Sequence, residues 1–437
     1  MSTAKLKDSE PIGKEANMDS IEHKTDSITT GLHRMPWTQS DNGFTWLEPT
    51  RKCNMACEYC YQRNDQNSEK SLEVIEMELK TMLRLRTCDT MLIAGGEPLT
   101  HPGIVKITRL VNSLGPKPVI LTNGHALTPE LVSELKSVGL FGFVFHVDSH
   151  QGRPGWEGKT ERELNKLRQY YADMVYEAQG LICAFNTTIL PETLHEVADI
   201  VKWTTDNLHK VSANVLIPVR TAHGEDPWDF YAGGEKITID HTPYVSKQCY
   251  RHLTALDICK EIWRVHPNYQ FHSYLGGTIL PDSPKWLFGT HIGTSKKLFG
   301  NLGSKSVELI QSIHHMFVGK FLSFSSPRIN RKAWLLFGFG IIDRSIRDAW
   351  KNRLISLLRN PLTLFEKISL QNIIVMQPHD YLPNGEQDEC DGCPNKTYWN
   401  GRLVSECRKE DYLLYGRPLA TVRKKPCSVP WRARLHA

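Results

Sequence analysis

Segments typical of β-strands alternate with segments typical of helices between about residues 40 and 220, and this alternation constrains the fold most strongly. Alternation at this spacing indicates βαβ units, which place parallel strands side by side in one sheet. Six units are too few for a closed eight-unit barrel, so we predict an α/β chain with a partial (β/α)6 barrel of the TIM type and function at the carboxyl ends of its strands. The expected strands are Phe44–Leu47, Thr90–Ile93, Val119–Thr122, Phe143–Val147, Ile182–Thr188 and Asn214–Val219, and the expected helices are Ser71–Arg86, Ile104–Ser113, Pro129–Val138, Glu161–Gln179 and Leu194–Asn207.

Composition divides the chain into four regions. Residues 1–38 are mostly polar and predict a disordered tail, and residues 39–225 hold the barrel pattern. Residues 226–375 are rich in glycine, proline and aromatics, and we expect a helical, basic region there. Residues 376–437 are rich in loops and hold four of the 11 cysteines. We expect no secretory signal and no bilayer-spanning run, which predicts a cytoplasmic, reducing location where clustered cysteines indicate metal chemistry.

Three cysteines lie close together just after the first expected strand. Cys53, Cys57 and Cys60 have three and two residues between them. Short spacing on one loop lets three thiolates converge on one iron–sulfur cluster and leaves one iron open to a chelating cosubstrate. A structural zinc site is the alternative, but it would need a fourth Cys or His, and none lies nearby.

A second motif, Ala94-Gly95-Gly96-Glu97-Pro98-Leu99, directly follows the second expected strand. Two glycines let a backbone approach a ligand closely, and Glu97 offers a carboxylate to an ammonium group. The two motifs in this order, with Tyr59 before the third cysteine, resemble the signature of the radical S-adenosylmethionine (SAM) superfamily. The resemblance covers about residues 40–220.

This resemblance implies a [4Fe–4S] cluster on Cys53, Cys57 and Cys60 with SAM bound to its open iron. It also implies that SAM is cleaved to methionine and a 5′-deoxyadenosyl radical that abstracts a substrate hydrogen, with a flavodoxin or ferredoxin as reductant. The catalytic residues that would act on the substrate stay unassigned. The residues expected to contact SAM are Tyr59 at the adenine, Gly95, Gly96 and Glu97 at the methionine end, and Asn123, Asp148 and Asn186 at strand ends, where turn and capping roles are the alternative.

A second cysteine set lies near the C-terminal end of the sequence. Cys390 and Cys393 are followed by Cys407, and between them Asn400-Gly401 predicts a hairpin turn that folds Cys407 back. The spacing resembles the auxiliary-cluster motif of the GTP cyclase of molybdenum-cofactor biosynthesis and the SPASM/twitch extensions. We expect a second [4Fe–4S] cluster in a small C-terminal Fe–S extension, with a structural zinc site as the alternative. Cys427 or His379 is the candidate fourth ligand, and Cys427 is preferred. The long basic region departs from the cyclase, so GTP cyclisation is not assigned.

The segment 284–361 is the main clue to the substrate. It holds thirteen Lys and Arg against three Asp and Glu, together with clusters of aromatic and aliphatic residues. A basic amphipathic helix over Asp343–Arg359 suits a membrane interface, so the chain is expected to act on a lipid, isoprenoid or other hydrophobic metabolite, in peripheral contact with the inner membrane face. The alternative is a helical subdomain whose apolar residues form its own core.

Three other functions fit parts of the pattern. Modification of a ribosomally made peptide is typical of many SPASM-bearing enzymes, although no peptide-recognition domain is evident at the N terminus. A non-catalytic Fe–S or zinc-binding scaffold is disfavoured by the complete cysteine set and Glu97. A nucleic-acid partner is disfavoured because the basic segment is rich in aliphatic rather than stacking residues, and the net charge of the chain is only +5.

Overall fold

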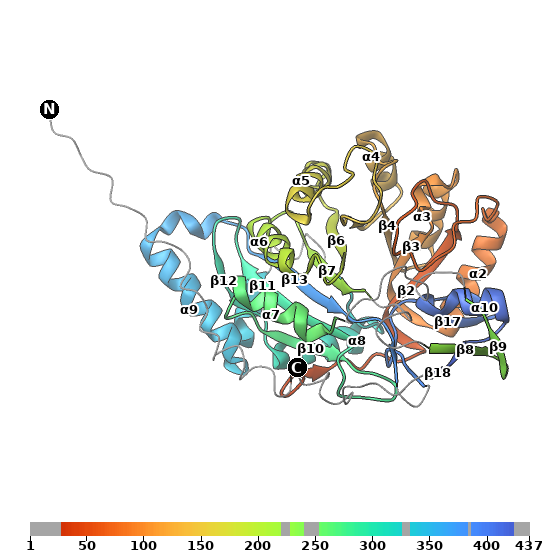
Figure 1. Ribbon diagram of the computed structural model, residues 1–437. Coiled ribbons are helices and arrows are strands. Elements are labelled where there is room, and N and C mark those ends of the chain that lie inside the picture. The colour runs from red at the N-terminus through yellow and green to blue at the C-terminus, as the bar shows by residue number, and fades with distance from the viewer. Residues whose placement is uncertain (1–27, 220–227, 240–252, 326–332, 383–385, 424–437) are drawn as a thin grey trace.

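A computed structural model describes residues 28–219, 228–239, 253–325, 333–382 and 386–423. Its main sheet has 11 strands, and all six expected strands lie in it, parallel and in sequence order (Figure 1). The six-unit half-barrel prediction is therefore confirmed for residues 41–218. The strands are β2 (Asp41–Thr50), β3 (Thr87–Gly95), β4 (Lys117–Thr122), β5 (Gly142–His146), β6 (Ile182–Ile189) and β7 (Ala213–Pro218).

Five helices cover the outer face of these strands, and each begins close to its expected position. Three of them start at a side chain that accepts a hydrogen bond from the first turn, which satisfies a backbone N–H that the helix itself cannot pair. These caps are Ser71, Thr128 and Thr160. The helices are α2 (Leu72–Leu85), α3 (Ile104–Ser113), α4 (Pro129–Ser137), α5 (Glu161–Ala178) and α6 (Val197–Asp206), the last preceded by a short 3-10 turn, η2 (Leu194–Glu196).

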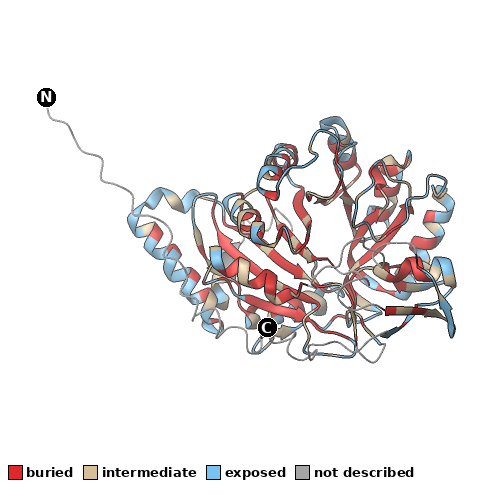
Figure 2. Ribbon diagram, viewed as in Figure 1, coloured by how far each residue is buried: buried red, intermediate tan, exposed pale blue. Residues whose placement is uncertain are grey.

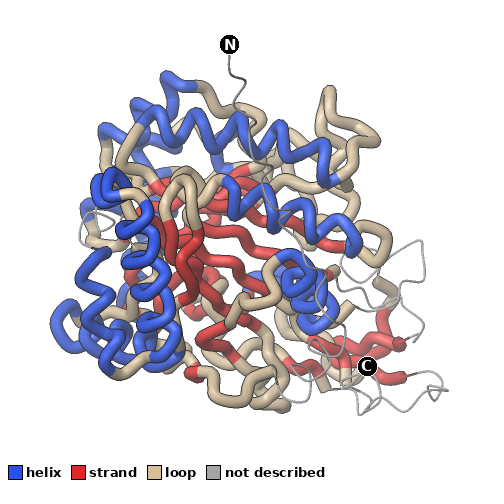
Figure 3. The backbone as a smooth tube through the Cα atoms, turned by 90° about the vertical axis from the view of Figure 1, so that its left-hand side faces the viewer, coloured by secondary structure: helices blue, strands red, loops and turns tan. Residues whose placement is uncertain are grey.

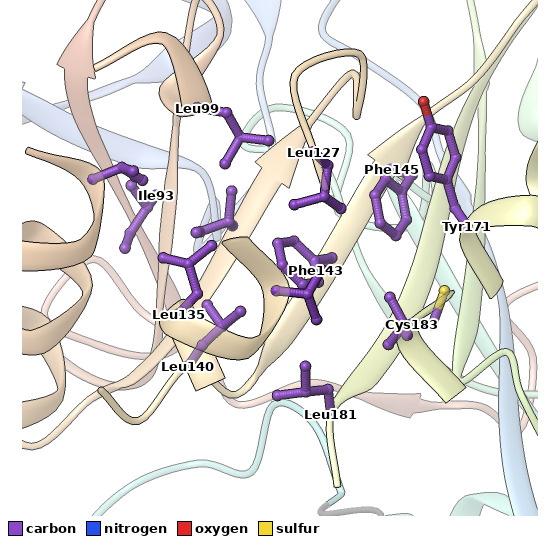
Figure 4. Packing of buried hydrophobic residues seen from close by; sticks show 14 of the residues in the cluster. Ile93, Leu99, Leu127, Leu135, Leu140, Phe143, Phe145, Tyr171, Leu181 and Cys183 are labelled. Carbon is purple, nitrogen blue, oxygen red and sulfur yellow. The ribbon is translucent and has the colours of Figure 1, made fainter. Parts of the chain in front are cut away.

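The core of this half-barrel lies between the strands and these helices. Figure 4 shows Phe143 and Phe145 of β5 beside Tyr171 of α5, and the rings of Phe145 and Tyr171 stack with centroids 4.5 Å apart. The strands are buried on nearly every residue, whereas the helices expose their outward faces (Figure 2). Burial on both faces is typical of parallel strands flanked by helices.

The region 226–375 differs from the helical region that the sequence predicts, because three of its strands extend the barrel sheet. β13 (Ser369–Met376) is parallel to β7, β11 (Trp286–Gly293) is antiparallel to β13, and β10 (Phe271–Leu275) is antiparallel to β11. The proposed boundary at residue 225 is therefore wrong as a limit of the sheet. The apolar run at Trp286 is expected in a helical region because β13, the strand that joins it to the barrel sheet, lies about 80 residues away in the sequence, beyond any local pattern.

Helices do occur in this region, around the added strands (Figure 3). They are α7 (Ala255–Val265), α8 (Ser304–Val318) and α9 (Arg344–Arg359), with the 3-10 segments η4 (Ala333–Ile341) and η5 (Pro361–Phe365) at either end of α9 and the short strand β12 (Leu298–Asn301) paired with β11. The expected helix over Asp343–Arg359 is confirmed, with Asp343 as its N-cap.

The N-terminal tail expected over residues 1–38 lies outside the described residues up to residue 27. From residue 28 onward the chain packs into the fold. β1 (His33–Arg34) pairs with β10, and Met35 and Trp37 are buried in the core beside β11. The tail prediction is therefore wrong for residues 28–38.

The C-terminal region forms small sheets that pack against the barrel. β16 (Lys396–Trp399) and β17 (Arg402–Ser405) form the predicted hairpin, with Asn400 and Gly401 at φ +45° and +80°. This pair of positive φ values is typical of a tight hairpin turn. The remaining elements are β14 (Asp380–Tyr381) with β15 (Gln387–Asp388), β18 (Ala420–Arg423) with β8 (Trp228–Ala232) and β9 (Glu235–Ile237), and η6 (Glu406–Arg408) before α10 (Lys409–Tyr415).

Within the described ranges, no helix is both long and apolar enough to cross a bilayer.

Candidate functional site

A cavity of about 420 Å³ occupies the interior of the half-barrel. Both cysteine sets line it, together with inward-facing side chains of every strand from β2 to β7 and of β10, β11 and β13. Two segments that are more than 300 residues apart in the sequence therefore meet at one chamber. The cavity-lining cysteines are Cys53, Cys57, Cys60, Cys390, Cys393 and Cys407.

The loop that carries the first cysteines is bonded directly to the glycine motif. The backbone N–H of Gly96 donates to the Thr50 carbonyl at 3.0 Å, and that of Glu97 donates to the Lys52 carbonyl at 2.8 Å. A Cβ on Gly95 would lie 2.3 Å from the Thr50 oxygen, and one on Gly96 would lie 2.3 Å from the Lys52 oxygen. Both glycines are thus required by the cysteine loop's own backbone, whereas the sequence suggested a ligand as the reason.

The carboxylate of Glu97 is hydrogen-bonded within the protein. It is 0% exposed and does not line the cavity. Its carboxylate accepts from the Thr122 hydroxyl at 2.6 Å and from the backbone N–H groups of Asn123 and Leu99 at 2.7 and 3.0 Å. Burial raises the pKa of this carboxyl, and the three hydrogen bonds oppose that rise. These bonds join the 3-10 turn η1 (Pro98–Thr100) to the end of β4, and binding of a ligand ammonium by this carboxylate stays a prediction.

The three cysteines of the first loop form no disulfide bond, and all three line the chamber. The Cys60 N–H donates to the Cys57 carbonyl at 3.3 Å, which forms a tight turn, and the Cys53 N–H donates to the Asn64 side chain at 3.1 Å. Burial raises the pKa of all three thiols. Three soft sulfur donors on one loop match the donor set of an iron–sulfur cluster. Among the described residues, no three Cys, His, Asp or Glu side chains are already gathered into a metal-binding group.

Asn123 and Tyr59 lie beside this loop. The Asn123 amide donates to the Asn54 side chain at 2.7 Å, which links the end of β4 to the cysteine loop. Tyr59 lines the chamber with its ring 5.4 Å from the ring of His150. Arg153, which sequence reasoning did not single out, donates to the Asn123 carbonyl at 2.7 Å and is 4% exposed. No local motif marks Arg153, because its partners Asn123 and Tyr171 are distant in the sequence.

Asp148, two residues after the end of β5, and Asn186 of β6 line the chamber. Asp148 is hydrogen-bonded to His146 Nε2 at 2.7 Å and accepts the backbone N–H of His150 at 3.0 Å. Burial alone would raise the pKa of Asp148, but these partners together hold it below its ordinary value. Asn186 pairs with His146 across the sheet, and its amide has no hydrogen-bond partner among the described residues. Asn186 is therefore the more available of the two for a ligand.

The second cysteine set is held beside the first by the barrel itself. Arg86, the residue that ends α2, donates to the Cys393 carbonyl at 2.9 Å and to the Pro394 carbonyl at 3.3 Å. Gly392 adopts φ +61°, and a Cβ there would lie 2.2 Å from the Trp37 carbonyl. A hydrogen bond with the Cys390 thiol lowers the pKa of Cys393 to about 7. His379 lines the same chamber, and Cys427 lies outside the described residues.

Buried polar contacts join the C-terminal region to β2 and the first cysteine loop. Lys409 donates to Glu48 at 2.7 Å, with both side chains almost fully buried. Gln62 donates to Glu406, and Arg51 pairs with Glu410. The C-terminal region is therefore part of the chamber wall.

A sequence profile of the Radical SAM superfamily matches residues 47–204, which run from β2 into α6. An AdoMet-dependent heme synthase of Methanosarcina barkeri is 27% identical over 190 residues, which cover 41% of this chain and 51% of the relative. A GTP 3′,8-cyclase of Alkaliphilus oremlandii is 31% identical over 106 residues, covering 23% and 33%. The structure of Streptococcus suis SuiB bound to S-adenosylmethionine has a TM-score of 0.37 and 17% identity, covering 52% and 47%.

The profile match over residues 47–204 and the order of the two motifs together support a radical SAM superfamily enzyme. Within that class, its barrel is similar in sequence to AdoMet-dependent heme synthases and GTP 3′,8-cyclases. The chain spans about half the length, or less, of the curated relatives that it matches.

Proposed function

We propose that this chain is a radical SAM enzyme that holds a [4Fe–4S] cluster on Cys53, Cys57 and Cys60 and binds SAM in the chamber beside it. When bound, the cluster supplies the electron that cleaves SAM to methionine and a 5′-deoxyadenosyl radical. The observation that carries the proposal is the shared chamber, which the three thiols line together with Tyr59, Asn123, Asp148 and Asn186.

The chain's own residues account for binding and for exclusion of water. The backbone of Gly95 and Gly96 lines the chamber next to the cysteine loop, in a position to hold the methionine end of SAM. Asn186 offers a free amide among the described residues, and Asp148 offers a carboxylate kept ionised by its partners. The apolar lining below them keeps a reactive radical away from water.

The experiment is anaerobic reduction of the iron-loaded protein with SAM, followed by measurement of released 5′-deoxyadenosine. Cys57→Ala is expected to abolish release, whereas Cys88→Ala is the control because Cys88 is buried in the core away from the chamber. No release from the loaded wild-type protein would refute the proposal.

We further propose a second [4Fe–4S] cluster on Cys390, Cys393 and Cys407. Their placement on the chamber, within the electrostatic influence of one another, supports it. Cys427 remains the proposed fourth ligand, and a structural zinc site is the competing assignment. A flavodoxin or ferredoxin is the proposed reductant for the first cluster.

The substrate is proposed to be a hydrophobic metabolite such as a lipid or isoprenoid. Away from the cysteines, aromatic and aliphatic side chains make up most of the chamber wall. No Lys or Arg of the described segments lines the chamber. A wall of this kind does not compensate the charge of a nucleotide phosphate. Modification of a ribosomally made peptide is the competing proposal, and a substrate-bound structure or a screen for consumed substrate would distinguish them.

Peripheral membrane contact is the last part of the proposal. On α9, Ile346, Ala349 and Arg353 face inward, whereas Trp350, Leu354 and Leu358 follow one another four residues apart on the exposed side. Leu358 is 85% exposed, and Phe365 of η5 is 82% exposed. Exposed cations lie on the same helix, at Arg344, Arg347, Lys351 and Arg359. An apolar strip bordered by cations suits an anionic lipid surface.

A further inference from the structure

The strand register divides the chamber into layers. In the layer nearest the cysteines, Thr188 of β6 pairs with Ile217 of β7. Two residues further down the strands, Asn186 pairs with His146 on one side and Val215 on the other. Two residues further again, Ala184 pairs with Ala213, and Ala213 pairs with Asn372 of β13. Four strand residues separate the first and third layers, which is about 13 Å.

The third layer is apolar on one side and polar on the other. Leu121, Val144, Ala184 and Ala213 line the chamber at this level, and the two alanines leave room that larger side chains would fill. The row then ends on Asn372 and Thr290, which are paired across β13 and β11. Thr290 is buried and Asn372 is half-buried, so the hydrogen bonds of this pair decide which polar group the chamber offers at this level.

The polar end of this layer is a chain of hydrogen bonds with a defined direction. Thr290 donates its hydroxyl to Asn372 Oδ1 at 2.6 Å. Its oxygen must then accept from His272 Nε2, which lies 2.9 Å away, and His272 Nδ1 in turn accepts from Ser273 Oγ at 2.9 Å. Burial lowers the pKa of His272 to about 3, so the ring is neutral and can hold this arrangement at neutral pH.

The result is an amide whose oxygen is occupied and whose nitrogen is not. Asn372 lines the chamber, and its Nδ2 has no hydrogen-bond partner among the described residues. Because Thr290 holds the oxygen, the amide presents N–H donors to the chamber. The described lining contributes no Lys or Arg, so the ligand group that these donors suit is an uncharged acceptor.

We propose that Asn372, oriented by Thr290 and His272, is a binding site for an uncharged hydrogen-bond acceptor, such as a carbonyl oxygen, at the inner end of an elongated apolar substrate. This rests on the proposed function, since it names the class of molecule that would lie between the cysteines and the third layer. It makes Asn372 a specificity residue and Thr290 a positioning residue, neither of which touches the reacting atoms.

The test uses the full chain, purified anaerobically with its iron, and two probes of matched shape. Acetophenone carries a carbonyl, and ethylbenzene replaces it with a methylene. Isothermal titration calorimetry measures each dissociation constant for the wild-type protein and for Asn372→Leu, Thr290→Val and Thr290→Ser. Asn186→Leu is a matched amide variant, because it removes the other unpartnered amide on the described wall, one layer nearer the cysteines.

We expect Asn372→Leu and Thr290→Val to raise the dissociation constant for acetophenone roughly five- to tenfold, the usual loss for one uncharged hydrogen bond. Thr290→Ser keeps the hydroxyl, so its dissociation constant for acetophenone should stay within about twofold of the wild-type value. The dissociation constant for ethylbenzene should be unchanged in all three variants. Equal weakening of both probes would mean that the side chains only shape the cavity. No change in acetophenone binding, or a loss confined to Asn186→Leu, would also overturn the proposal.

This measurement needs no SAM, so it is separate from the test of the proposed function. Wild-type protein that fails to release 5′-deoxyadenosine but discriminates between the probes through Asn372 would refute the enzyme proposal and keep the binding site. Release of 5′-deoxyadenosine without discrimination between the probes would support the enzyme proposal and refute the binding site at Asn372.

Discussion

The backbone N–H of Glu97 donates to the carbonyl of Lys52 at 2.8 Å, and Lys52 is the residue before Cys53. Together with the bond from Gly96 to Thr50, this contact extends the pairing of β2 with β3 into the cysteine loop. The two motifs that mark the superfamily are therefore one structural unit, in which the second motif supports the first.

The first prediction concerns Gly96→Ala. The new Cβ would lie 2.3 Å from the Lys52 oxygen, which is backbone and cannot rotate away. We expect a loss of about 1–3 kcal/mol in unfolding free energy, as for overpacked sites, and a sharp fall in bound iron. Urea unfolding and iron analysis provide the measurements. Gly338→Ala is the control, because a Cβ there meets no atom within 4 Å. A variant with normal iron content would argue against this coupling.

The second prediction concerns the number of clusters. Two [4Fe–4S] clusters give about eight iron and eight sulfide per chain, and Cys390→Ala should lower both to about four. Cys183→Ala, a buried core cysteine away from the chamber, should leave the counts unchanged. One zinc and about four iron in the wild-type protein would instead support the structural zinc site.

The third prediction concerns Lys409 and Glu48, a buried ion pair with a separation of 2.7 Å. Lys409→Met would leave Glu48 buried without its cation, which typically costs about 3–5 kcal/mol. Lys409→Met combined with Glu48→Gln should cost less than Lys409→Met alone, because the unpaired charge of Glu48 is removed as well. Thermal and urea unfolding measure this. Additive losses would show that the two residues act independently.

The fourth prediction is acid sensitivity at His272, whose pKa lies at about 3 in the folded chain against an ordinary value of 6.5. The unfolded chain therefore binds a proton below pH 6.5 that the folded chain does not bind until about pH 3. Between these values, stability falls as pH falls, by up to about 1.4 kcal/mol per pH unit. His272→Gln should reduce the difference between urea unfolding at pH 5 and at pH 7. If His272→Gln leaves this difference unchanged, His272 is not a source of the loss of stability at acid pH.

The fifth prediction concerns the exposed apolar strip. The wild-type chain should float with liposomes that contain anionic lipid at low salt and should bind less as salt rises. Replacing Leu358 and Phe365 together with Glu should abolish flotation without changing the melting temperature, because both side chains are more than four-fifths exposed. Met77→Glu, at an exposed apolar residue of α2, is the control. Equal flotation of the Leu358/Phe365 variant would reject the membrane proposal.

Local patterns were sufficient where the structure depends on neighbours in the sequence. The six parallel strands, the helices expected from Ser71 and from Glu161, and the Asn400-Gly401 hairpin all follow from periodicity and turn chemistry within a few residues. The cysteine and glycine motifs, in this order, were enough to indicate a radical SAM enzyme, because strand ends in such a sheet meet at one edge.

The tertiary structure alone decided the rest. Pairing of β11 with β13 and of β13 with β7 joins segments about 80 and 160 residues apart, and such contacts leave no local signature. Because of these pairings, part of the region expected to be helical forms strands of the barrel sheet. The same pairings place Asn372, Thr290 and His272 in the chamber lining. The tertiary structure also shows that the Glu97 carboxylate accepts hydrogen bonds from Thr122 and Asn123, which the motif does not reveal. A motif specifies which groups are present, whereas burial and partners from distant strands determine what each group is free to bind.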